Sequence, residues 1–356
     1  MSHEKRRNEA KWSALPVLVL WMIKDKLDIF DDMCVASVCH DWRAASLSYP
    51  KKQSIREGMP WLMQQNKNVD SSLQDFISIT RKKKVTLYLP EFSNALVLFS
   101  KQGWVLLRRK NFVVTRERLP DSVFLINPLT KAKIELPDVA ESHEFFGSFS
   151  THDGYPVSVV LISAGIFCRI TLRTAKPGDL VWTKHAPVER TMQFEGCRGL
   201  ISIGEQIFYF DIWGKMTIYN MATRVWKELL RPRNELEGVN YIAEHDGKII
   251  KLFAGGYDDH TSYAISVYND ADTSWERVKI DEMSSVWYLS RLHNCFCARE
   301  SGSKIYLLRP KYGGLLRCTR TIRGYTVLSH ELNDGGTQTL QLPYEIYPSA
   351  KWVDLG

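Results

Sequence analysis

The chain has 356 residues, a length that suits a small module followed by one large domain. Its hydrophobic content of 44% and charged content of 24% are typical of globular proteins, and its aromatic content of 12% favours β structure. The net charge of +7 is a mild excess and does not indicate a dedicated nucleic-acid binder, which usually concentrates its charge on one face.

The first apolar stretch could be a signal peptide, a membrane anchor or a buried helix. Its uncharged run covers 14–23 and ends at Lys24, whereas a membrane-spanning helix needs about 20 apolar residues. The flank "KDKLDIFDD" does not resemble a signal-peptide cleavage site. We therefore expect a short helix, apolar on most sides, that is buried within the protein or against a partner. Residues 1–11 before it are expected to be flexible.

Three short helices are predicted over 12–46. The first begins with Ser13 as a cap and runs to about Leu27, and the second begins near Phe30. Because three short helices form a poor core, we expect a partner or the following domain to stabilise them. An amphipathic stripe at i, i+3, i+4 and i+7 follows the start of the second helix: Val35, Val38, Cys39 and Trp42.

The segment 47–84 has a weak and polar pattern, and we interpret it as a linker with some helix. The basic run Arg81, Lys82, Lys83 and Lys84 is interpreted as a solvated loop or face, with a nuclear-localisation patch as the alternative.

From 85 to 356 the pattern changes to short β-type runs separated by Gly, Asn, Asp and Pro. A strand, a polar turn and a second strand recur at a spacing on the order of 45 to 65 residues, which is at or above the period of a propeller blade. This domain is therefore expected to be a degenerate β-propeller of roughly six blades, at about 45 residues per blade. A two-sheet β-sandwich array is the alternative. The fold class is mainly β with a small N-terminal α domain.

No motif for catalysis, metal binding or cofactor binding stands out. His293, Cys295 and Cys297 would share one side of a strand, but zinc sites usually use Cys-x2-Cys or His-x3-His pairs, so we interpret them as strand residues. The seven cysteines are odd in number and scattered, which favours reduced thiols and a location in the nucleus and/or cytoplasm.

The N-terminal helices resemble an F-box. Leu18 stands where that family often has an acidic residue, and Cys34 stands where a basic one is usual. The family pattern reads without a gap in this chain as Leu15, Pro16, Val19, Leu20, Ile23, Leu27, Asp31, Val38, Cys39, Trp42 and Arg43.

The rest of the chain resembles plant F-box proteins whose C-terminal module is called domain of unknown function 295, with a kelch-like architecture. The resemblance spans nearly the whole chain, although each β motif is loose. It rests on "FLINPLTKAKIELP", "IFYFDIWGKMTIYN", "VNYIAEHDGKIIKLF", "YAISVYNDADTSWERVKI" and "YPSAKWVDL".

The resemblance implies a non-catalytic subunit of a ubiquitin ligase. Its F-box would bind a Skp-type adaptor, and through it a cullin and a RING subunit. Val35, Val38 and Trp42 could instead only hold the three helices together. The residues expected to contact or support the adaptor are Leu15, Pro16, Val19, Leu20, Ile23, Val35, Val38, Cys39, Trp42 and Arg43.

The β domain would then recruit an unknown protein substrate through loops on one face. The alternative function is a propeller-like module that binds nucleic acid or a glycan, for which we expect strongly salt-dependent binding without an adaptor. The candidate substrate-binding residues, taken as exposed loop positions, are Trp104, Arg108, Arg109, Lys110, Tyr257, Asp258, His260, Lys311 and Tyr312.

Overall fold

The structure is a computed structural model, and the chain divides into two compact units, Met1–Arg56 and Glu57–Gly356. The structure describes residues 12–49, 60–65, 72–111, 119–140, 145–164, 170–185, 197–211, 215–229, 238–255, 262–279, 285–290, 295–299, 304–313, 321–332 and 337–355.

The first unit contains three short helices, as predicted, preceded by a 3₁₀ turn. Asp28 caps the second helix, because its Oδ1 accepts hydrogen bonds from the backbone N–H groups of Phe30 (3.0 Å) and Asp31 (2.9 Å). Within the described residues no helix is long and apolar enough to cross a membrane. The elements are η1 (Trp12–Ala14), α1 (Val17–Lys24), α2 (Ile29–Val38) and α3 (His40–Leu47).

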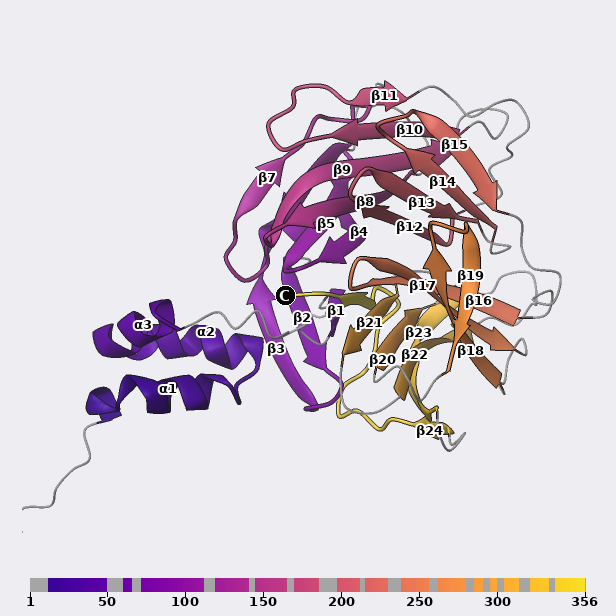
Figure 1. The fold of residues 1–356 in the computed structure, drawn as a ribbon. Helices are drawn as coiled ribbons and strands as arrows, with labels where there is room; N and C mark the ends of the chain where they lie inside the picture. Colours follow the sequence, from indigo (N-terminus) through magenta and orange to yellow (C-terminus); the bar gives the residue numbers. More distant parts are fainter. Residues whose placement is uncertain are drawn as a thin grey trace, which may run out of the picture. The chain divides into compact units, whose positions relative to one another are not determined.

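The second unit is a six-bladed β-propeller, which confirms the predicted architecture over the sandwich alternative (Figure 1). From the inner to the outer strand, blade 1 contains β25 (Lys351–Val353), β1 (Trp61–Gln65), β2 (Leu73–Ser78) and β3 (Lys83–Tyr88). After η2 (Pro90–Phe92), blade 2 contains β4 (Ala95–Lys101), β5 (Trp104–Arg109), β6 (Ser122–Ile126) and β7 (Lys133–Glu135). Blade 3 contains β8 (Phe145–His152), β9 (Tyr155–Ala164), β10 (Ile170–Ala175) and β11 (Thr183–His185).

Blade 4 contains β12 (Gly199–Ile203), β13 (Gln206–Phe210), β14 (Met216–Asn220) and β15 (Val225–Leu229). Blade 5 contains β16 (Gly238–His245), β17 (Lys248–Gly255), β18 (Ser262–Asn269) and β19 (Ser274–Val278). Blade 6 contains β21 (Phe296–Arg299), β20 (Ser285–Ser290), β22 (Lys304–Gly313), β23 (Thr321–Glu331) and β24 (Thr337–Thr339).

A tight turn between the first two strands recurs in the blades. Gly103, Gly154 and Gly247 occupy the second turn position in blades 2, 3 and 5, with φ of +84°, +79° and +70°. The residue before each glycine also has positive φ, so these are turns of the kind that joins two-residue hairpins without splaying the strands.

The C-terminal strand closes the ring of blades. β25 pairs antiparallel with β1, and Leu62 lies opposite Trp352. The Trp352 side chain is 2% exposed, and its Nε1 donates to the Leu289 carbonyl of blade 6 at 3.1 Å. The two ends of the propeller sequence therefore complete one sheet and contact the last blade.

The structure differs here from the linker expected over 47–84. The strands β1 and β2 fall within that segment, and β3 begins at Lys83. Because β1 is buried on both faces at Trp61 to Gln64, its sequence does not alternate between apolar and polar residues and lacks the usual strand signal. The basic run lies in the turn before β3 and at its start, and Lys84 Nζ lies 3.4 Å from Asp75 of β2.

Blade 6 departs from the pattern of the other blades. Its β20 and β22 are parallel, and β21 adds a fifth strand at the inner edge of the sheet. The inner strands contact one another in the order β25, β4, β8, β12 and β16, and β21 lies against β16 while β20 lies against β25. The extra strand β21 therefore lies on the axial side of blade 6, next to blade 5.

Candidate functional site

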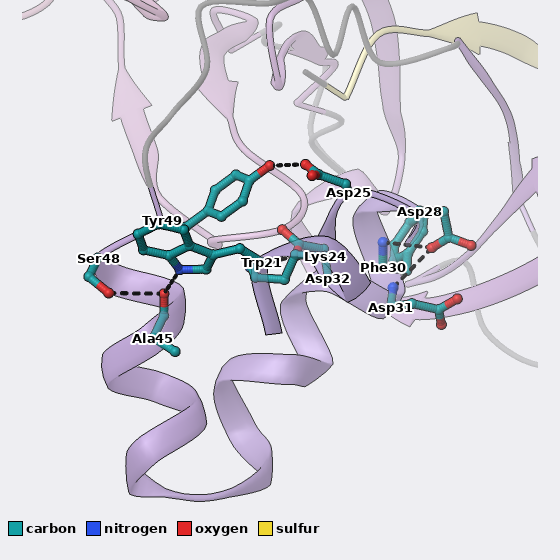
Figure 2. Close-up of polar contacts among 10 residues, drawn as sticks. All are labelled: Trp21, Lys24, Asp25, Asp28, Phe30, Asp31, Asp32, Ala45, Ser48 and Tyr49. Atoms are coloured by element: carbon teal, nitrogen blue, oxygen red, sulfur yellow. Dashed lines mark hydrogen bonds and ion pairs between the residues drawn. The ribbon is translucent and has the colours of Figure 1, made fainter. Parts of the chain in front are cut away.

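Polar contacts fix the three helices of the first unit to one another (Figure 2). Lys24 of α1 is 4% exposed, and its Nζ lies 2.5 Å from Asp32 Oδ1 of α2. Trp21 of α1 donates from its Nε1 to the Ala45 carbonyl of α3 at 2.9 Å. These two contacts hold α1 against both other helices.

Tyr49, just after α3, adds a third connection (Figure 2). Its hydroxyl donates to Asp25 Oδ1, and its ring stands edge-on to Trp21 with centroids 6.1 Å apart. Lys24 Nζ lies 5.5 Å from the Tyr49 ring centroid, within the range of a cation–π interaction. The helical unit is thus held together partly by polar groups, because few apolar side chains are available for a core.

The outer surface of the helical unit is rich in exposed apolar side chains. Leu18 and Met22 of α1 are 67% and 68% exposed, and Val19 lies beside them on the outward side of that helix. We call the whole set the apolar docking surface: Trp12, Val17, Leu18, Val19, Met22, Met33, Val38 and Leu47. Exposed apolar groups are unusually dense for a unit of this size.

The ten residues predicted to contact or support an adaptor divide by exposure. Leu20 and Val35 are buried within the unit and can only support it. The exposed members are Pro16, Val19, Val38 and Arg43, and the half-buried members are Leu15, Ile23, Cys39 and Trp42.

Trp42 and Arg43 also take part in the unit's own hydrogen bonds. Trp42 Nε1 donates to the Trp12 carbonyl at 3.0 Å, and Arg43 Nε donates to the Ala36 carbonyl at 3.1 Å. Of the three residues whose role was left open, Val35 lies in the core, Val38 lies outside it, and Trp42 is half-buried between the two.

Several members of the apolar docking surface are absent from the predicted set. Leu18 departs from the family pattern, and Met22, Met33 and Leu47 belong to no motif. What distinguishes these residues is how many of them the unit exposes. Eight of the 17 large apolar side chains that are exposed among the described residues belong to this unit.

The candidate substrate-binding residues do not come together in the structure. The expectation of exposed loop positions is wrong for Trp104 and Arg108, which lie in β5 and are 5% and 2% exposed. Arg108 Nε donates to Asp121 Oδ2 at 2.7 Å, its Nη2 donates to the same oxygen, and its guanidinium lies 4.0 Å from the Phe145 ring centroid. A partner 13 residues away in the sequence thus allows the charge to be buried.

The other seven candidate substrate-binding residues lie at or after the end of β5, in β22, or outside the described residues. Arg109 ends β5, where its Nη2 donates to the Glu91 carbonyl at 2.6 Å, and Lys110 follows it. Lys311 and Tyr312 lie in β22, and Lys311 is exposed. Tyr257, Asp258 and His260 fall outside the described residues.

The residues considered for a metal site lie at the inner edge of blade 6. Cys297 is buried in β21, Cys295 precedes that strand, and His293 falls outside the described residues. Burial raises the pKa of the Cys295 thiol to about 12, and its Sγ donates to the Ser290 carbonyl at 3.6 Å. Among the described residues no group of three or more His, Cys, Asp or Glu side chains could hold a metal ion.

Comparisons with known proteins give the following matches. A family model described as KIB1-4 beta-propeller matches residues 76–310. An F-box protein of Arabidopsis thaliana is 21% identical over 303 residues, covering 80% of this chain and 77% of that protein. An F-box/kelch-repeat protein of the same plant is 24% identical over 292 residues, covering 77% and 73%. The domain name expected from the sequence, domain of unknown function 295, is not the name of the matching model.

Among solved structures, TolB from Acinetobacter baumannii has a TM-score of 0.47 and 9% identity, covering 83% of this chain and 66% of that one. A likeness this loose carries no argument about function.

Proposed function

Because the chain belongs to the KIB1-4 β-propeller family of plant F-box proteins, we propose that it is the substrate-recognition subunit of a Skp–cullin–F-box ubiquitin ligase. In this proposal the helical unit binds a Skp-type adaptor, and the adaptor joins it to the cullin and the RING subunit. The propeller recruits a protein substrate, in the nucleus and/or cytoplasm.

The apolar docking surface is the observation that carries the proposal. A helix that exposes Leu18 and Met22 fits an apolar groove on a partner, where their area is removed from water. The Lys24–Asp32 ion pair and the Trp21–Ala45 hydrogen bond fix the helices beforehand, so that little conformational freedom remains to be lost on binding. The adaptor therefore meets a preformed surface.

The propeller contributes position rather than chemistry in this proposal. A substrate held on it has a high effective concentration near the ubiquitin-charged enzyme, which makes the transfer to a substrate lysine in effect intramolecular. No residue of this chain is assigned a bond-making role.

The test is co-purification of the full chain with a Skp-type adaptor. Val19→Asp and Met22→Asp each place a charge in the apolar contact, so we expect at least a tenfold loss of adaptor binding. Leu180→Asp is the matched control, because Leu180 is an apolar residue of the propeller that is 90% exposed, and this variant should bind like the wild type.

Both docking variants should keep the thermal unfolding of the propeller, since neither residue belongs to that unit. Adaptor binding at the wild-type level by Val19→Asp and by Met22→Asp would refute the proposal. If the chain binds nucleic acid in a salt-dependent way and does not bind the adaptor, the alternative function as a nucleic-acid-binding module is supported instead.

A further inference from the structure

An ion pair joins two blades that stand opposite each other in the ring. Lys101 ends β4 of blade 2, and Glu244 lies next to the end of β16 of blade 5. Lys101 Nζ donates to both Oε1 and Oε2 of Glu244 at 2.7 Å. Because these blades are three apart in a ring of six, the two side chains meet across its axis.

The C-terminal segment is attached at the same end of the ring. Just beyond β25, the Asp354 N–H donates to Ser100 Oγ at 2.9 Å, and Asp354 Oδ2 accepts from the Gln102 N–H at 2.6 Å. These contacts flank Lys101 in the sequence. The residues at the end of β4 therefore hold both the end of β25 and the ion pair between blades 2 and 5.

The extra strand of blade 6 approaches the same inner strand of blade 5. β21 lies against β16, and the Cys295 thiol just before it also makes a backbone hydrogen bond to Ile242, two residues before Glu244. Cys295 therefore lies beside the strand that carries one half of the ion pair, and its reactivity can report whether water reaches the axis there.

We propose that Lys101 and Glu244 form a latch across the ring axis, which closes the central channel at the end where the inner strands terminate and keeps the ring shut. The two side chains are 17% and 19% exposed, so solvent screens their attraction only in part. Removing one partner leaves the other, largely buried charge without its counter-ion, which favours entry of water.

The latch can be tested in the full chain by removing each charge at nearly constant size. Lys101→Met and Glu244→Gln should each raise the rate at which iodoacetamide alkylates Cys295 by tenfold or more, with the modified site identified by mass spectrometry. Entry of water should lower the pKa of this thiol from about 12 towards its ordinary value, which supplies the reactive thiolate. The exposed thiol of Cys34 serves as the internal standard, and its rate should not change.

Two further variants separate the latch from a general loss of stability. Lys304→Met removes an ion pair of the same chemistry, in which Lys304 Nζ lies 2.8 Å from Glu331 Oε1. This pair joins neighbouring strands of one sheet, and its side chains are 40% and 43% exposed. This variant should leave Cys295 protected. The double variant Lys101→Glu with Glu244→Lys exchanges the two charges and should restore the protection of Cys295 from alkylation.

Unchanged alkylation of Cys295 in both single variants would overturn the proposal. If the single variants fail to fold, the double variant with the two charges exchanged tests the proposal. Recovery of the folded, protected state supports the latch, and failure to recover it contradicts the latch.

Discussion

The helical unit and the propeller place their apolar side chains differently. Within its described residues the helical unit buries four apolar side chains, Leu20, Phe30, Val35 and Ala45, and exposes eight large ones. The propeller exposes nine large ones over a far longer chain and packs both faces of its inner strands between neighbouring blades. The propeller is closed by its own strands, whereas the helical unit leaves most of its large apolar side chains exposed.

The two regions should therefore differ in stability. A unit with four buried apolar side chains gains little free energy from its core and should be only marginally stable. The propeller, which is closed by β25 and packed throughout, should unfold later and cooperatively.

The largest expected effect comes from opening the propeller. Removing 351–356 deletes β25, exposes β1 along its whole inner edge and takes away Trp352, a buried residue for which substitution by Ala would itself cost about 3–5 kcal/mol. We expect the propeller to lose its cooperative unfolding transition in urea. Hydrogen exchange in peptides from 12–49 should be unchanged, because the helical unit is a separate compact unit. A truncated chain with the wild-type urea midpoint would contradict the role assigned to β25.

A smaller effect is expected from the core of the helical unit. Leu20→Ala should cost about 2–5 kcal/mol, enough to unfold a marginal unit, while the propeller remains folded. Hydrogen exchange followed by mass spectrometry would show loss of protection in 12–49 only.

The matched control for Leu20→Ala is Leu18→Ala, the same change at an exposed position of the same helix. It should alter stability by less than about 0.5 kcal/mol. Equal loss of protection in both variants would mean that burial does not distinguish these two leucines.

The smallest expected effect is a dependence on pH in the closing strand. Lys351 Nζ of β25 donates to the Val97 carbonyl at 2.9 Å, and burial lowers the pKa of this lysine from 10.5 to about 8. Between these two values the unfolded chain holds the proton more tightly than the folded chain, so stability rises as the pH increases from 8 to 10.5. Below pH 8 both states are protonated and this contribution to stability is absent.

The expected gain is on the order of 1 kcal/mol, because the side chain is partly exposed and solvent screens its charge. Urea unfolding of the wild type and Lys351→Met across this pH range would measure it. The wild type should become more stable relative to the variant as the pH rises, and a constant difference would refute the assignment.

The sequence predicted the three helices, the propeller and about six blades, because their signals are local. The apolar residues of α1 are contiguous in the chain, and hairpins such as Asp153–Gly154 recur from blade to blade. Strand β1 was missed because it pairs with β25, almost 300 residues away, and its own five residues do not alternate. The fifth strand of blade 6 depends on a parallel pairing that no local pattern indicates.

Individual site residues were harder to predict than the fold. An arginine in a strand suggests exposure, but Arg108 is buried because Asp121 and the Phe145 ring surround its guanidinium. In the helical unit, Leu18 and Leu20 are the same residue type two positions apart, and only the packing of the helices shows that one is exposed and the other is buried.

The pairing of β1 with β25 also determines when the ring can form during synthesis. β1 emerges from the ribosome long before its partner, and until residues 351–353 follow, its inner edge remains available for mispairing. The helices need no such distant sequence, so they can fold while the rest of the chain is still being translated.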